Sequence, residues 1–262
     1  MQTAPLKSLA DVRILITRSK DENETLAKKL RQLGAIVAEL PTIEFAPPEN
    51  TKPLDQSIKM LSKYDWLIFT SRHGVQFFSK RMAALGEPPG RLREVKVAAI
   101  GPATAAALQS LGKKPDYVPY EFLSSQIARG LGDVKGKRIL LPRTDIASRG
   151  LPEELRMQGT SVDEVVVYRT VVPEDLSLDR LLLILKQGLD VVTFTSPSTV
   201  RNLAHVASVE GLGALLEDVR VACIGPVTAD AAKALGVHVD IVALNHTIDN
   251  LVEAIVNEIR TV

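Results

Sequence analysis

The segment RILITR at residues 13–18 returns as RILLPR at residues 138–143, and this repetition decides how the chain is organised. Three further pairs of segments recur at nearly the same offset: FTS at 69–71 and 194–196, IGPAT at 100–104 and IGPVT at 224–228, and DYV at 116–118 and DIV at 240–242. The offset is far longer than a solenoid repeat and is of domain length. We therefore interpret the 262 residues as two copies of one domain-sized unit.

Each copy alternates short apolar runs with segments of helical spacing. Residues 12–17 predict a buried strand, and residues 24–33 predict a helix that Gly34 ends. The other expected strands are 36–40, 66–69, 97–100, 138–141, 162–168, 191–194 and 219–224, and the other expected helices are 104–111, 151–158 and 228–235. This alternation predicts an α/β fold with parallel sheets, whose strand-to-helix turns meet at the carboxyl edge of each sheet.

The residues leave open how the half-copies pair. They follow one another as 11–45, 65–120, 138–172 and 190–244. Consecutive pairing would need one linker. Pairing the middle two with each other and the outer two with each other would need two linkers, and the proline-bearing stretches 41–48 and 170–173 are candidates for them.

Composition excludes several classes of protein. The chain is 45% hydrophobic, so it can bury a core, and its net charge of +1 argues against a protein that binds nucleic acid through a broad basic field. Cys223 is the single cysteine, which excludes an intrachain disulfide and a cysteine metal cluster, and its apolar surroundings predict a small buried side chain. No signal-peptide pattern or membrane-length apolar run occurs. We expect a cytoplasmic protein that binds neither nucleic acid nor membrane.

The sequence lacks the common cofactor and metal motifs. It contains no G-x-G-x-x-G after the first strand, no Walker A loop and no G-x-S-x-G elbow. The four histidines are scattered without metal-ligand spacing. We therefore expect no cofactor and no metal. The pattern favours a binder of a polyanion, or an enzyme whose chemistry needs little beyond positioning.

The repeated strand-to-helix turns are the candidate binding groups. Serine is a preferred helix N-cap, and the free N–H groups at a helix start bind anions such as carboxylates. Glycine allows close backbone approach, and a threonine in the first helical turn can reach a ligand. The candidates are Ser71, Ser196, Ser198, Gly101, Gly225, Thr104 and Thr228. The alternative is that these residues only cap helices and form tight turns.

Three further residues lie at strand ends. Arg18 and Arg143 follow the first strand of each copy at equivalent positions, and each could pair with a carboxylate in bidentate geometry. Their alternative is a solvated surface arginine. Tyr168 ends the run VVVY at 165–168, and without further information it would be a packed aromatic with a satisfied hydroxyl.

At these residues the sequence resembles the uroporphyrinogen-III synthase family, from about Val12 to about Val256. The resemblance rests on the order and spacing of FTS with Val75, IGPAT, VYRT at 167–170, FTSPS at 194–198, and IGPVT. It implies two flavodoxin-like (HemD-like) α/β domains joined by a two-stranded linker. Residues 1–42 and 174–262 would form one domain and residues 48–169 the other, with linkers near 41–48 and 169–174.

The family resemblance also implies a function. The substrate would be hydroxymethylbilane, a linear tetrapyrrole with eight carboxylates, held in the cleft between the domains and closed to uroporphyrinogen III without a cofactor. Tyr168 matches the family tyrosine that is proposed to help the hydroxyl leave as water. A monomer with transient contact to hydroxymethylbilane synthase is expected. The alternative is a two-lobed binding or regulatory protein for a small polyanion.

Overall fold

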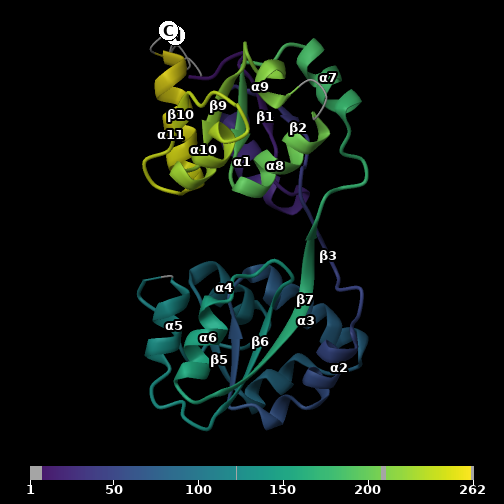
Figure 1. Cartoon of the computed structure of the whole chain (residues 1–262), viewed down its shortest axis with the longest axis vertical. Helices are drawn as coiled ribbons and strands as arrows, with labels where there is room; N and C mark the ends of the chain where they lie inside the picture. The colour runs from purple at the N-terminus through teal and green to yellow at the C-terminus, as the bar shows by residue number, and fades with distance from the viewer. Residues whose placement is uncertain (1–7, 122, 208–210, 261–262) are drawn as a thin grey trace, which may run out of the picture. The chain divides into compact units, whose positions relative to one another are not determined.

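The structure, a computed structural model, describes residues 8–121, 123–207 and 211–260 and divides the chain into two units (Figure 1). Unit 1 combines Met1–Glu44 with Val171–Val262, and unit 2 is the continuous stretch Phe45–Thr170. The chain passes between the units twice, once within strand β3 (Glu44–Ala46) and once within strand β7 (Ser161–Val171).

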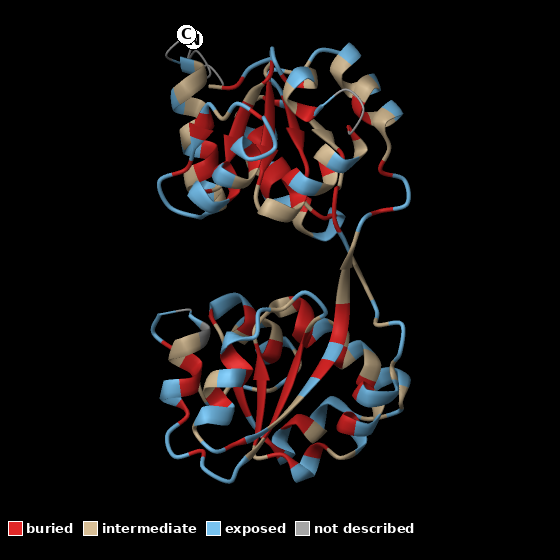
Figure 2. Ribbon diagram, viewed as in Figure 1, coloured by how far each residue is buried: buried red, intermediate tan, exposed pale blue. Residues whose placement is uncertain are grey.

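Unit 2 is built on a five-stranded sheet in the order β3-β7-β6-β4-β5. Besides β3 and β7 the sheet contains β4 (Trp66–Phe69), β5 (Lys96–Ala99) and β6 (Arg138–Thr144), and the β7-β6-β4-β5 ladder is parallel throughout. All four residues of β4 are buried, as expected for a central strand covered on both faces. Figure 2 shows these strands as the buried centre of the unit.

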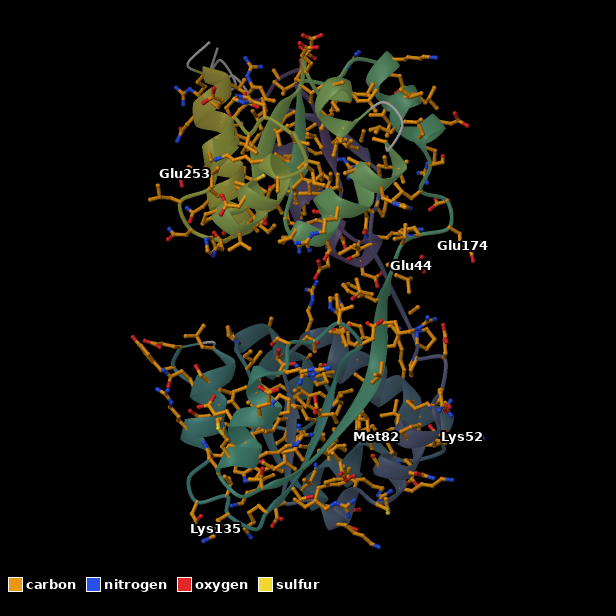
Figure 3. The ribbon with its side chains drawn as sticks, viewed as in Figure 1. Glu44, Lys52, Met82, Lys135, Glu174 and Glu253 are labelled. Atoms are coloured by element: carbon orange, nitrogen blue, oxygen red, sulfur yellow. The ribbon has the colours of Figure 1, made fainter. Side chains whose placement is uncertain are left out.

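Helices cover both faces of this sheet. One apolar cluster joins the sheet to α2 (Lys52–Lys59), α3 (Arg72–Ala84) and α4 (Pro102–Ser110), and buries Met82, which Figure 3 labels. A second cluster on the other face includes residues of α5 (Ser124–Gly130) and α6 (Gly150–Met157). Two short 3-10 helices, η1 (Leu61–Lys63) and η2 (Pro89–Glu94), complete the unit.

Unit 1 repeats this architecture with strands from both parts of the chain. Its sheet has the order β10-β9-β8-β1-β2, and every pairing is parallel. The strands are β1 (Arg13–Ile16), β2 (Ile36–Glu39), β8 (Val191–Phe194), β9 (Arg220–Cys223) and β10 (Ile241–Val242). The central contact is therefore between β1 and β8, which lie far apart in the sequence.

Helices of unit 1 also lie on both faces of its sheet. One apolar cluster includes residues of α7 (Leu178–Lys186), α8 (Pro197–Val206), α9 (Leu212–Leu215) and α10 (Pro226–Lys233). The other includes residues of α1 (Lys20–Gln32) and α11 (Ile248–Arg260). The expected α/β class with parallel sheets is thus confirmed in each unit.

The internal repeat is also visible in side-chain hydrogen bonds. Asp65 and Asp190, which precede β4 and β8, each accept the backbone N–H that opens the neighbouring strand, from Arg138 at 2.9 Å and from Arg13 at 2.7 Å. Each unit therefore fixes the register of its central strand pair with the same device.

Candidate functional site

In unit 2 two helices begin directly after strands at the carboxyl edge of the sheet. Ser71 separates β4 from α3, and its Oγ accepts the Gly74 N–H at 2.9 Å. Gly101 separates β5 from α4, with Pro102 opening the helix and Thr104 buried in its first turn. The first backbone N–H groups of such helices have no partner within the helix, so both starts can bind an anion.

Unit 1 presents the same arrangement at its own carboxyl edge. Ser196 caps α8 by accepting the Thr199 N–H at 3.3 Å, and Ser198 is half-buried in the first turn of that helix. Gly225 precedes α10, and Thr228 is buried in its first turn. A Cβ on Gly225 would lie 2.4 Å from Cδ2 of His246, so glycine permits the close approach of that side chain. The sequence prediction that the repeated turns share a sheet edge is confirmed within each unit.

Tyr168 lies among aromatic side chains beside the start of α3. It is 6% exposed, and its hydroxyl oxygen is 3.1 Å from Oγ of Ser71. The ring of Phe77 stacks on it at 5.6 Å between centroids, and Phe45 meets it edge-on at the same distance. Only the combination of a buried ring and a hydroxyl at a helix start makes this a candidate reactive group.

His73 also belongs to this cluster, and like Phe45 and Phe77 it was not among the site residues predicted from the sequence. It is buried, and its ring lies 4.0 Å from that of Phe45 and 6.1 Å from that of Tyr168, measured between centroids. The sequence did contain a pattern that could have placed His73 beside Phe77. The two residues are four positions apart and therefore share one face of the helix that follows Ser71.

Arg18 and Arg143 both form ion pairs inside their own units. Arg18 lies in the turn after β1, and its Nη2 is 2.8 Å from Oε2 of Glu22. Arg143 lies within β6, where its Nη1 is 2.8 Å from Oε2 of Glu164 and its Nη2 donates to the Ser148 carbonyl. Neither is the solvated surface arginine of the alternative interpretation. To bind a substrate carboxylate, each guanidinium would have to release its present carboxylate partner or bind both carboxylates at once.

Arg143 also borders a polar cavity of about 410 Å³ in unit 2, on the sheet face opposite Tyr168. Its walls carry three positive and three negative side chains, Arg143, Arg149, Arg156, Asp145, Glu153 and Glu164. This balance gives the cavity no preference for an anion.

Metal and thiol chemistry find no support in the described part of the chain. No group of three histidine, cysteine or acidic side chains in that part is placed to hold a metal ion. Burial raises the pKa of the Cys223 thiol to about 12, so it stays protonated and acts as the small buried side chain expected. Across the same residues, no helix is both long enough and apolar enough to span a bilayer.

Comparison with known proteins gives a consistent result. Residues 24–253 match the family model "Uroporphyrinogen-III synthase HemD". The uroporphyrinogen-III synthase of Synechococcus elongatus is 34% identical over 248 residues, which cover 92% of this chain and 93% of that protein. The porphyrin biosynthesis protein HemD of Ruminiclostridium josui is 32% identical over 94% of this chain and 48% of its own length.

Solved structures agree on the fold. A mutant uroporphyrinogen III synthase from the extremely thermophilic bacterium Thermus thermophilus superposes with a TM-score of 0.66 at 20% identity, covering 96% of this chain and all of its own. The corresponding protein of Helicobacter pylori 26695 gives a TM-score of 0.64 at 19% identity, covering 94% of this chain and 99% of its own. At this level of identity, the agreement concerns the architecture only.

Proposed function

This chain belongs to the uroporphyrinogen-III synthase family, and we propose that it converts hydroxymethylbilane to uroporphyrinogen III. The reaction closes the linear tetrapyrrole into a ring, inverts ring D and releases water, so the enzyme is a cyclising lyase. One observation in the structure supports this most directly. The hydroxyl of Tyr168 lies at the carboxyl edge of a sheet, against the N-cap of α3, in a buried aromatic surrounding.

Helix starts would supply the binding of the substrate carboxylates. A ligand with eight carboxylates meets a chain of net charge +1, so a broad positive field does not hold it. Backbone N–H groups and hydroxyls at a helix start stabilise negative charge without adding a positive side chain. The proposed contacts are Ser71, Gly101 and Thr104 in unit 2, and Ser196, Ser198, Gly225 and Thr228 in unit 1. Arg18 and Arg143 would add bidentate pairing.

The main task of the protein would be orientation. Hydroxymethylbilane closes by itself, but to the type I isomer, in which ring D is not inverted. A site that holds ring D so that its substituted carbon attacks selects the other product through a spiro intermediate. Such positioning can account for a large part of a rate enhancement without covalent chemistry by the protein.

Tyr168 would act as the acid in the first step. As the carbon–oxygen bond of the hydroxymethyl group breaks, its electron pair stays on oxygen, which takes the phenol proton and leaves as water. Ring closure later releases one proton from the substrate, and this proton restores the phenol. A phenol has an ordinary pKa of about 10, so it is a weak acid at neutral pH and its contribution should be modest.

The deciding experiment is an isomer analysis. Hydroxymethylbilane is generated with its synthase, this protein is added, and the oxidised products are separated into type I and type III. We expect type III to dominate. Type I alone, at every protein concentration, would overturn the proposal and leave a binding or regulatory protein of the same fold.

The remaining expectations about partners belong to this proposal. We propose that the protein acts as a monomer and takes its substrate in a transient contact with hydroxymethylbilane synthase, because free hydroxymethylbilane is lost to the wrong isomer. A cytoplasmic location stays a prediction.

A further inference from the structure

Strand β7 carries a bulge immediately before Tyr168. Val166 pairs with Arg143, but the next pair along the ladder joins Tyr168 to Thr144, so Val167 is an additional residue. Side chains of a regular strand alternate between the two faces of the sheet. An additional residue moves each side chain that follows it to the opposite face. In a regular ladder Tyr168 would lie on the face of Val166, which borders the Arg143 cavity.

The bulge turns Tyr168 to the face covered by α3. Val167 and Tyr168 are consecutive, yet both belong to the apolar cluster that includes residues of this helix. Phe45 and Phe77 pack on the phenol ring and fix its plane. The hydroxyl is thereby brought within 3.1 Å of the Ser71 Oγ.

The Ser71 hydroxyl is itself held in place. Its backbone is extended, with φ −157° and ψ 153°, and its Oγ accepts the Gly74 N–H at the start of α3. A Cβ on Gly74 would lie 3.3 Å from this Oγ and 3.7 Å from the Pro142 carbonyl, so the first turn of α3 lies close to both the cap hydroxyl and the sheet.

We infer that Ser71 is a positioning residue, which donates its hydroxyl hydrogen to Tyr168 and thereby directs the phenol hydrogen toward the leaving hydroxyl of the substrate. A serine hydroxyl has one hydrogen and can accept through its lone pairs. Because Oγ accepts from Gly74, its own hydrogen is available for the phenol oxygen. The same hydrogen bond stabilises the phenolate that remains after proton transfer, and it strengthens as charge develops there.

This inference rests on the proposed function. Because the single hydroxyl hydrogen of Ser71 goes to Tyr168, a carboxylate contact at this helix start would use backbone N–H groups, which Ser71→Gly keeps. A serine that only binds a substrate carboxylate would affect substrate affinity, independently of Tyr168. A serine that acts through Tyr168 would affect turnover, and only while the phenol hydroxyl is present.

The test is a double-mutant cycle of Ser71→Gly and Tyr168→Phe, with kcat and KM measured for type III formation. Glycine is nearly as good an N-cap as serine, so Ser71→Gly removes the hydroxyl at little cost to the helix. We expect Ser71→Gly alone to lower kcat about three- to tenfold with KM almost unchanged, as for loss of one hydrogen bond. In the Tyr168→Phe background the same substitution should change kcat by less than about twofold.

Ser177→Gly is the matched control. Ser177 caps α7 in the same way, by accepting the Arg180 N–H at 3.4 Å, and has no proposed part in the reaction. It should leave both kinetic constants at the wild-type value. Ser71→Ala, which keeps the Cβ, repeats the cycle if Ser71→Gly lowers the melting temperature more than Ser177→Gly does.

Two outcomes would overturn the role of Ser71. One is that the kcat losses of the single variants multiply in the double variant, and the other is that Ser71→Gly raises KM and leaves kcat unchanged. A wild-type protein that yields only type I would overturn the proposed function itself. The isomer analysis of the wild-type protein is therefore done before the double-mutant cycle.

Discussion

At the scale of single residues, Tyr168 fits both interpretations that the sequence allowed. It is a packed aromatic with a partnered hydroxyl, and it is also a hydroxyl at the helix start where a substrate carboxylate would bind. The sequence predicted Tyr168 and Ser71 as candidates, but not their contact. The two residues are 97 positions apart, and the bulge at Val167 reverses the face that simple alternation gives to Tyr168.

Tyr168→Phe should lower turnover without abolishing it. The variant keeps the aromatic packing and loses the acid, and because a phenol is a weak acid we expect kcat for type III formation to fall by about ten- to a hundredfold. Tyr64→Phe is the control, since it removes another buried phenol hydroxyl. Tyr64 lies just before β4, and its hydroxyl donates a hydrogen bond to Asp163 at 2.8 Å. It should affect stability but not turnover. Turnover of Tyr168→Phe equal to that of the wild type would remove the acid role.

At the scale of elements, the repeat predicted those helices and strands that kept their sequence in both copies. It did not predict α2 and its counterpart α7, or α5 and its counterpart α11. The sequences of each pair have little in common, so comparison of the copies could not reveal them. The bulge was hidden for another reason, since VVVY at 165–168 reads as an uninterrupted buried strand.

The contact between α2 and α3 gives a prediction about pH and stability. Arg81 donates to both carboxylate oxygens of Asp55 at 2.6 Å, and this pairing holds the pKa of Asp55 below its ordinary value of 3.8. A folded-state pKa below the unfolded one means that the stabilisation is complete above pH 3.8. It is lost as the pH falls through the folded pKa.

Asp55→Asn should therefore destabilise the protein at neutral pH and matter little in acid. We expect the free energy of unfolding to fall by about 1–2 kcal/mol at pH 7, allowing for the partial exposure of the pair. The difference from the wild type should shrink below pH 3.8. Urea titrations at several pH values measure it, with Glu24→Gln on the exposed face of α1 as the control. An equal difference at pH 7 and pH 3 would contradict the assignment.

At the scale of the whole molecule, the sequence predicted the α/β class and the duplication, while the residues alone left the pairing of the half-copies open. Short motifs cannot settle that question, because β1 would find a similar apolar partner in either arrangement. In the structure β1 pairs with β8 of unit 1, and β4 pairs with β6 of unit 2. Which half-copies pair depends on how all the apolar faces of the strands and helices are covered together, and no single motif contains that information.

Unit 2 should fold by itself. Residues 45–170 contain the ladder from β4 to β7 and both of the apolar clusters that cover it. A protein of these residues should show cooperative unfolding in urea and dispersed amide signals in an NMR spectrum. Residues 171–262 alone are the control, because they lack β1 and β2 and should not fold cooperatively. A molten 45–170 fragment would contradict the prediction.

The contact between β1 and β8 also sets an order of events during synthesis. The strand Arg13–Ile16 leaves the ribosome long before Val191–Phe194, its neighbour in the finished sheet. The continuous unit in between is complete by then and can fold first. Until β8 emerges, β1 is an apolar strand with an unpaired edge, the kind of segment that associates with other chains or recruits chaperones. Interrupted translation would therefore leave one finished unit carrying an unpaired, aggregation-prone N-terminal strand.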